Sequence, residues 1–167
     1  MGLHEPFSDR SQPPQPSTTP QGTAKSLYQN EVFLHLRNDY PKPITDFLAP
    51  CFSGSLIARF EASCQQRQRW LRDHRNQNMK LPMPEGPVFV GRYEGATSAD
   101  VETAEIVGGH ATVRVRLRRF SLSEGTDTWF DVTHFSLEDG HWLLEDIEFD
   151  VPADSEHRLT RRLLLSE

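Results

Sequence analysis

The chain lacks any long apolar segment. Its longest apolar runs, Trp142-Leu143-Leu144 and Leu163-Leu164-Leu165, fall far short of the roughly 20 residues that a membrane-spanning helix needs. The first residues also lack the basic start and apolar stretch of a secretory signal. We therefore predict no membrane span, and either a cytoplasmic protein or one from which a signal has been removed.

Cysteine is scarce, with only Cys51 and Cys64 present. A zinc site needs about four ligands, and no His or Cys stands at short ligand spacing from either cysteine, so we predict no metal. A disulfide would require an oxidising compartment, and two buried thiols that behave as small apolar side chains are the favoured interpretation.

The motifs of several enzyme classes are missing as well. The sequence contains no Gly-rich phosphate loop, nucleophile elbow, His-Glu-x-x-His zinc helix or Walker motif. We therefore assign no catalytic residue and predict no cofactor.

The charge is acidic but mixed. Eighteen Lys and Arg against 24 Asp and Glu give a net charge of −6, which weakly repels nucleic acid and lipid headgroups. Nucleic acid is therefore not an expected partner.

The composition divides the chain into three parts. Residues 1–22 are rich in Pro, Ser, Gln and Thr, which predicts a flexible leader. Residues 23–150 have the length of one domain, and residues 151–167 form an extension. Three leucines in this extension predict a short amphipathic helix: Leu159, Leu163 and Leu164.

The first half of the domain has a helical pattern. Apolar residues predict a helix over 23–38, which the prolines at 41 and 43 end. A helical turn is predicted around Thr45 to Leu48, and a longer helix over 55–76. Three prolines and Gly86 make the stretch Lys80 to Pro87 an irregular connection.

After Pro87 the apolar period changes to two, which predicts strands. Strands are expected at 88–93 and 101–107, and Gly108-Gly109 predicts a hairpin turn. In the return strand Ala111, Val113, Val115 and Leu117 share one face, which we expect to be buried. A second hairpin is predicted from about 128 to 149, with its turn at Asp139-Gly140. The predicted class is α+β, with amino-terminal helices packed on an antiparallel β-sheet.

This order of elements resembles the nuclear transport factor 2-like superfamily, also called cystatin-like or SnoaL-like. The segment Glu138 to Ile147, an Asp-Gly turn followed by Trp and an alternating strand, is similar to the last hairpin of that superfamily. The resemblance covers about residues 23–150. It implies a curved sheet and a cone-shaped cavity between the sheet and the helices.

Within the superfamily, the chain is most similar to small bacterial envelope proteins and lipoproteins of unknown function, which implies a periplasmic or envelope-tethered location. Members also include ketosteroid isomerases, SnoaL-type cyclases and dehydratases, binding proteins and toxin-immunity proteins. Their enzymes hold an Asp, His or Tyr in the cavity. None of their catalytic motifs matches this chain residue by residue, and fold alone does not choose a function.

His134 and Asp131 are the candidates for acid–base chemistry. Alternation in the strand places His134 beside Val132 and puts Asp131 on the opposite face. Either side chain could act as a general base if its face lined a cavity. For His134, bonding to a neighbour or to solvent is the favoured interpretation. The candidates for lining a ligand pocket are Trp70, Tyr93, Trp129 and His134.

Arg114, Arg116 and Arg118 form a basic stripe, the best candidate for contact with another protein. Cross-strand ion pairing is the favoured interpretation, and the acidic strand that holds Glu145 and Glu148 is the expected partner of the arginines.

The leading hypothesis is a non-enzymatic binding protein of the bacterial envelope, of which an immunity protein that blocks a secreted toxin is one form. The rival hypothesis is a small cavity enzyme, an isomerase, cyclase or dehydratase, that uses His134 or Asp131 as base. The partner is then a protein or a small apolar ligand. A homodimer through the exposed sheet face is a third alternative.

Overall fold

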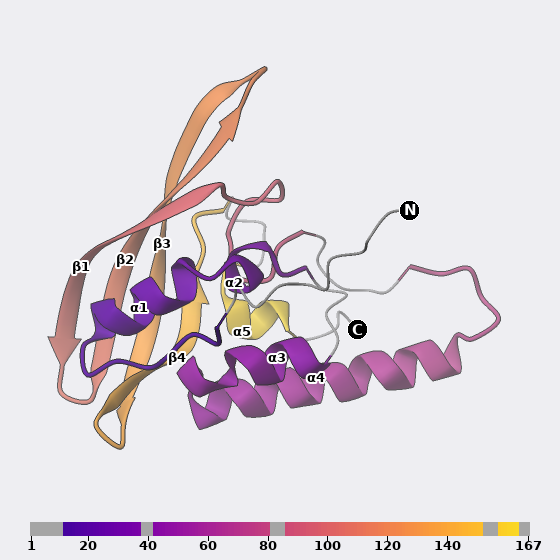
Figure 1. Cartoon of the computed structure of the whole chain (residues 1–167). Coiled ribbons are helices and arrows are strands. Elements are labelled where there is room, and N and C mark those ends of the chain that lie inside the picture. The colour runs from indigo at the N-terminus through magenta and orange to yellow at the C-terminus, as the bar shows by residue number, and fades with distance from the viewer. Residues whose placement is uncertain (1–11, 38–41, 81–85, 152–156, 164–167) are drawn as a thin grey trace, which may run out of the picture.

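The computed structural model describes residues 12–37, 42–80, 86–151 and 157–163. Short helices precede one long helix, and an antiparallel sheet follows (Figure 1). The helices are α1 (Pro20–Tyr28), α2 (Glu31–His35), α3 (Lys42–Leu48), the 3-10 helix η1 (Ala49–Cys51), α4 (Gly54–Asp73) and α5 (Leu159–Arg162). The strands are β1 (Ser98–Val107), β2 (His110–Ser121), β3 (Gly125–Glu138) and β4 (His141–Glu148).

The predicted α+β class is confirmed. The four strands pair antiparallel in the order β1-β2-β3-β4, joined by hairpins. Asp139 and Gly140 both have positive φ, 49° and 78°, which is the backbone of a two-residue type I′ turn. Gly108, at φ 60°, makes the β1–β2 turn in the predicted place.

The sheet has one buried face and one partly exposed face. The four residues predicted to share a face of β2 are all buried: Ala111, Val113, Val115 and Leu117. Figure 1 shows α1 lying across this side of the sheet, which we call the inner face. Thr112, Arg114, Arg116 and Arg118 lie on the opposite, outer face.

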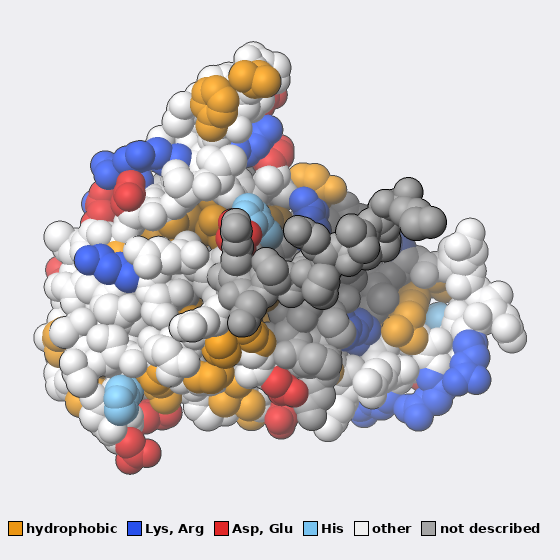
Figure 2. Space-filling view, in the orientation of Figure 1, with side chains coloured by type: hydrophobic (Ala, Val, Ile, Leu, Met, Phe, Trp, Pro, Cys, Tyr) orange, Lys and Arg blue, Asp and Glu red, His pale blue; other side chains and the backbone are white. Residues whose placement is uncertain are grey.

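The long helix α4 forms where the sequence predicts it. Ser53 caps its first turn by accepting a hydrogen bond from the amide of Leu56 at 3.2 Å. Leu56, Phe60 and Ser63 are its buried residues, so only the first half of α4 is anchored in the core. The second half extends away from the sheet, and Lys and Arg side chains gather at its far end (Figure 2).

The prediction of one helix over 23–38 is wrong. The helix stops at Tyr28, and α2 begins after Asn30. The side chain of Asn30 accepts hydrogen bonds from the amides of Val32 and Phe33, so it caps a new helix in a new direction.

The prediction of a flexible leader is also wrong for residues 17–22. Thr19 caps α1 by accepting a hydrogen bond from the amide of Gly22 at 3.1 Å, and Pro20 occupies the first helical turn. The carbonyl of Ser17 accepts from the amide of Trp142 at 2.9 Å, next to the sheet. The predicted boundary at residue 23 therefore falls inside α1, while residues 1–11 lie outside the described part.

No regular strand forms over 88–93, contrary to prediction. Pro87 makes only an isolated bridge with Arg37, and the amide of Val88 donates to the carbonyl of Leu36 at 2.7 Å. Val88, Phe89 and Val90 are nevertheless buried. Their apolar run reflects burial in the core rather than a place in the sheet.

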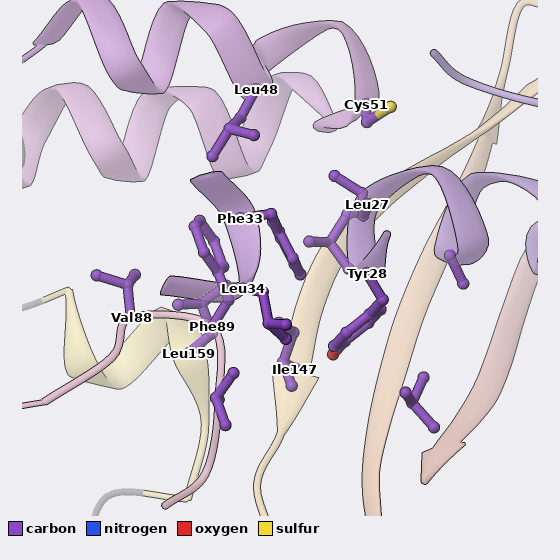
Figure 3. Close-up of a cluster of buried hydrophobic side chains, with 14 of the residues drawn as sticks. Leu27, Tyr28, Phe33, Leu34, Leu48, Cys51, Val88, Phe89, Ile147 and Leu159 are labelled. Atoms are coloured by element: carbon purple, nitrogen blue, oxygen red, sulfur yellow. The ribbon is translucent and has the colours of Figure 1, made fainter. Parts of the chain in front are cut away.

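A cluster of aromatic rings lies between the helices and the segment that holds Phe89, within the buried apolar core (Figure 3). Phe33 stacks on Phe89 with 4.2 Å between ring centroids, and Tyr28 meets Phe33 edge-on at 5.1 Å. Phe52 and Phe60 each lie 5.7 Å from the ring of Phe89. Phe89 thus joins rings from α2, from the residue after η1 and from α4.

The carboxy-terminal extension packs on the sheet through α5. Leu159 and Leu163 are buried, as an amphipathic helix requires. Asp146 of β4 accepts hydrogen bonds from the amide and the hydroxyl of Thr160, at 3.1 and 3.2 Å, and so satisfies the first turn of α5. Leu164 lies outside the described residues. None of the helices in the described ranges is long and apolar enough to cross a membrane.

Candidate functional site

The arginine stripe lies on the outer face and is held by carboxylates of β1. Arg118 contacts Asp100 at 2.8 Å, and Arg116 contacts the same carboxylate at 3.3 Å. Glu102 lies 3.7 Å from Arg116 and 3.8 Å from Arg114. Cross-strand ion pairing therefore occurs, but the predicted partner strand is wrong. In the sheet order, β3 separates the arginines of β2 from the acidic residues of β4.

Apolar side chains of β3 lie beside this stripe. The guanidinium of Arg114 lies over the ring of Phe130, 3.8 Å from its centroid, which is a cation–π contact. Val132 pairs across the strands with Arg114 and, like Phe130, is only partly buried. The centre of the outer face is therefore a charged row next to an apolar row.

His134 also faces outward. Its Nε2 lies 3.5 Å from Oε2 of Glu148, and 26% of the side chain is exposed. Arg158 contacts the same carboxylate at 3.3 Å and also donates to Asp146 at 3.2 Å. His134 is thus a strand histidine next to a carboxylate, on the face away from the core.

Asp131 points the other way, into the core, where its residue is fully buried. Burial raises the pKa of Asp131 to about 6, although hydrogen bonds from the amides of Asp150 and Gly91 act against the rise. The hydroxyl of Tyr28 is buried without a hydrogen-bond partner among the described residues. Burial raises the pKa of Tyr28 strongly, and the charge of Asp131 adds to this effect.

The four candidates for lining a ligand pocket are not gathered around one space. Trp129 is buried on the inner face of β3, whereas His134 lies on the outer face. Tyr93 is 57% exposed, with Arg37 5.9 Å from its ring centroid. Trp70, on the second half of α4, stacks on His74 with 4.2 Å between centroids.

Both cysteines are free. Cys51 is buried, and burial raises the pKa of its thiol to about 12, so the thiol stays protonated. Cys64 is partly exposed and lines a small cleft of about 30 Å³ between α3 and α4. Within the described ranges, no group of three His, Cys, Asp or Glu side chains is placed to hold a metal ion.

Sequence reasoning missed two contributors to the outer face. Phe130 has the same alternation as Val132 and His134, so the two-residue period was a sufficient signal for its position. Arg158 carried no such signal, because its place beside β4 depends on a bridge to Glu148 ten residues earlier in the chain.

Comparisons of the chain with protein-family models, with curated proteins and with solved structures found no match.

Proposed function

We propose that this chain is a non-enzymatic protein-binding module that binds its partner through the outer face of the sheet. The observation that carries the proposal is the row of ion-paired arginines next to the partly buried Phe130 and Val132. Arg and aromatic side chains are enriched at protein interfaces.

The ion pairs favour binding because they fix the arginines in advance. Arg116 and Arg118 share the carboxylate of Asp100, and Arg114 rests on Phe130. A partner that meets side chains already held in place loses less conformational entropy on binding. Each exposed pair adds only about 0–1 kcal/mol to folding stability, so recognition is a better reason than stability for a network of this size.

The resemblance to the nuclear transport factor 2-like superfamily, with its cone-shaped curved sheet, extends this proposal to a location. We propose the periplasm or the cell envelope, where an immunity protein against a secreted toxin would be one form of such a module. A homodimer through the same face is the alternative occupant, which the experiment below distinguishes.

The test is site-specific photo-crosslinking on the whole chain. Benzoylphenylalanine at position 132 should crosslink a defined partner in extracts of the source cells. The same group at Ala62, exposed on α4, is the control. A partner captured at 132 only, and lost after Phe130→Asp, supports the proposal. A product of twice the chain mass identifies the homodimer, and equal products from both positions overturn the proposal.

A second candidate function, the cavity enzyme, is favoured by one observation. Asp131, with its pKa at about 6, and the unpartnered hydroxyl of Tyr28 both lie in the interior. Two observations argue against the cavity enzyme. Both carboxylate oxygens of Asp131 already accept hydrogen bonds from backbone amides, and aromatic rings fill the neighbouring core. Exchange of the α-protons of 3-methylcyclohexenone in D₂O tests it, because catalysis should be lost in Asp131→Asn.

A further inference from the structure

A row of four polar side chains crosses the outer face near the β1–β2 turn. The strand register aligns Glu105 with Thr112, Thr112 with His134, and His134 with Asp146. The arginine stripe begins only at Arg114, further along β2. This end of the outer face therefore differs in charge from the end that holds the arginines.

A groove of about 190 Å³ lies at this end. Its lining comes from all four strands: Glu105, Val107, His110, Ala111, Thr112, His134, Phe135 and Glu145. Pockets for drug-sized ligands usually measure roughly 300–1,000 Å³. The volume therefore fits a single side chain better than a free small molecule.

The groove is electronegative. Glu105 and Glu145 line it, and no Lys or Arg does. In the described part of the chain Glu105 makes no ion pair, and the only ionic contact of Glu145 is with His110, at 3.7 Å. The nearby Arg158 is already held by Asp146 and Glu148.

Two polar atoms in this region also lack hydrogen-bond partners among the described residues. They are Oγ of Ser136 and Nε2 of His134, both shielded from solvent, although Nε2 of His134 lies 3.5 Å from the carboxylate of Glu148. Ser136 pairs with His110 across the strands, so both atoms lie on the same end of the face. Burying polar atoms without partners costs free energy, which a ligand that donates hydrogen bonds can recover.

We propose that this groove binds a lysine or arginine side chain of the protein partner. The inference rests on the proposed function and names the chemistry that the outer face recognises. Glu105 and Glu145 flank the cationic group from β1 and β4. The exposed apolar side chain of Val107 contacts its methylene stem, as long basic side chains require. Arginine suits the groove best, because its planar guanidinium can stack on the imidazole of His110 or His134. In that position it can also donate hydrogen bonds to the carboxylate of Glu105 or Glu145.

The first arm of the test uses a defined probe on the whole chain. Nα-acetyl-arginine methylamide is titrated, and the imidazole signals are followed by NMR. We expect shifts at His110 and His134, and none at His35 and His74, which lie on or next to helices. The uncharged citrulline analogue should give no shifts. Glu105→Gln with Glu145→Gln should weaken probe binding about 3- to 10-fold.

Asp127→Asn is a control for the loss of surface charge, since it removes a negative charge at the far end of the same β2–β3 hairpin. It should leave probe binding unchanged. Equal shifts with the citrulline analogue, or equal loss in Asp127→Asn, would overturn the inference.

The second arm separates this inference from the proposed function. The double glutamine variant is tested in the crosslinking experiment at position 132. If the partner is captured as well as by the unaltered chain, the groove inference fails and the protein-binding role stands. If position 132 captures no partner, the proposed function itself fails, whatever the probe does. Reduced capture that matches the weakened probe binding supports both.

Discussion

Asp131 accepts a hydrogen bond from the backbone amide of Gly91, with 3.1 Å between Oδ2 and the amide nitrogen. Its other oxygen, Oδ1, accepts from the amide of Asp150 at 3.0 Å. Arg162 of α5 donates to the carbonyl of Val90 at 3.2 Å beside the same loop. One buried carboxylate on β3 therefore links a loop 40 residues earlier with the segment that leaves β4.

This link predicts how stability changes with pH. Burial raises the pKa of Asp131 from 3.8 to about 6, so folding disfavours the charged form. The contribution of protonated Asp131 to the free energy of unfolding is complete below pH 3.8, and it is lost as the pH rises through 6. The shift of about 2 units corresponds to about 3 kcal/mol. We expect the free energy of unfolding of the unaltered chain, relative to Asp131→Asn, to increase by about that amount from pH 7.5 to pH 4.

Urea denaturation at several pH values measures this difference. Asp127→Asn serves as the control for the loss of an exposed carboxylate from the same strand. A flat difference for Asp131→Asn would show that Asp131 titrates at its ordinary pKa in the folded protein.

A methyl group at Gly91 should disturb the same contact. A Cβ there would lie 2.9 Å from Oδ1 of Asp131 and 3.3 Å from Cβ of Phe149. Both neighbours are buried and cannot move aside freely, so Gly91→Ala should lower the free energy of unfolding by about 1–3 kcal/mol. Gly109→Ala is the control, since a Cβ there meets nothing within 4 Å. Equal stability of the two variants in urea would contradict the packing described here.

The aromatic cluster gives a third prediction. Phe89 is fully buried among Phe33, Phe52 and Phe60, so Phe89→Ala leaves a cavity and should cost about 3–5 kcal/mol. Phe120 has the same chemistry but is 59% exposed on the projecting β2–β3 hairpin, where Figure 2 shows exposed hydrophobic side chains. Phe120→Ala should change stability by less than about 0.5 kcal/mol. Thermal unfolding of both variants tests the contrast.

The sheet could be predicted from sequence because its determinants are local. Alternation in β2 and the turns at Gly108-Gly109 and Asp139-Gly140 depend on residues within a few positions of one another. The run at Val88 to Val90 has the same apolar composition as a strand, yet its backbone bonds to Leu36 instead of a ladder. Composition cannot distinguish a buried strand from a buried loop.

On the outer face, too, the local pattern could be predicted from the sequence and the long-range contacts could not. The two-residue period placed Arg114, Arg116 and Arg118 together, but their acidic partners depended on strand order. The sequence holds acidic residues on both β1 and β4, and only the position of β3 decides between them. The groove was not predicted at all, because Glu105 and Glu145 lie 40 positions apart and meet only through the complete sheet.

The final prediction concerns the start of α1, where composition indicated a flexible leader. Thr19 caps the helix, and Thr23 donates to the carbonyl of Trp142 at 2.8 Å, so this segment is tied to β4. Thr19→Ala should lower the free energy of unfolding by about 0.5–2 kcal/mol. Thr18→Ala, at an exposed neighbour, should have little effect. A chain that starts at Thr23 loses the cap, Pro20 and the bond from Trp142 to Ser17, so it should be less stable than Thr19→Ala in urea. If it is as stable as the whole chain, the contacts of residues 17–22 with α1 and β4 contribute nothing to folding, which contradicts this prediction.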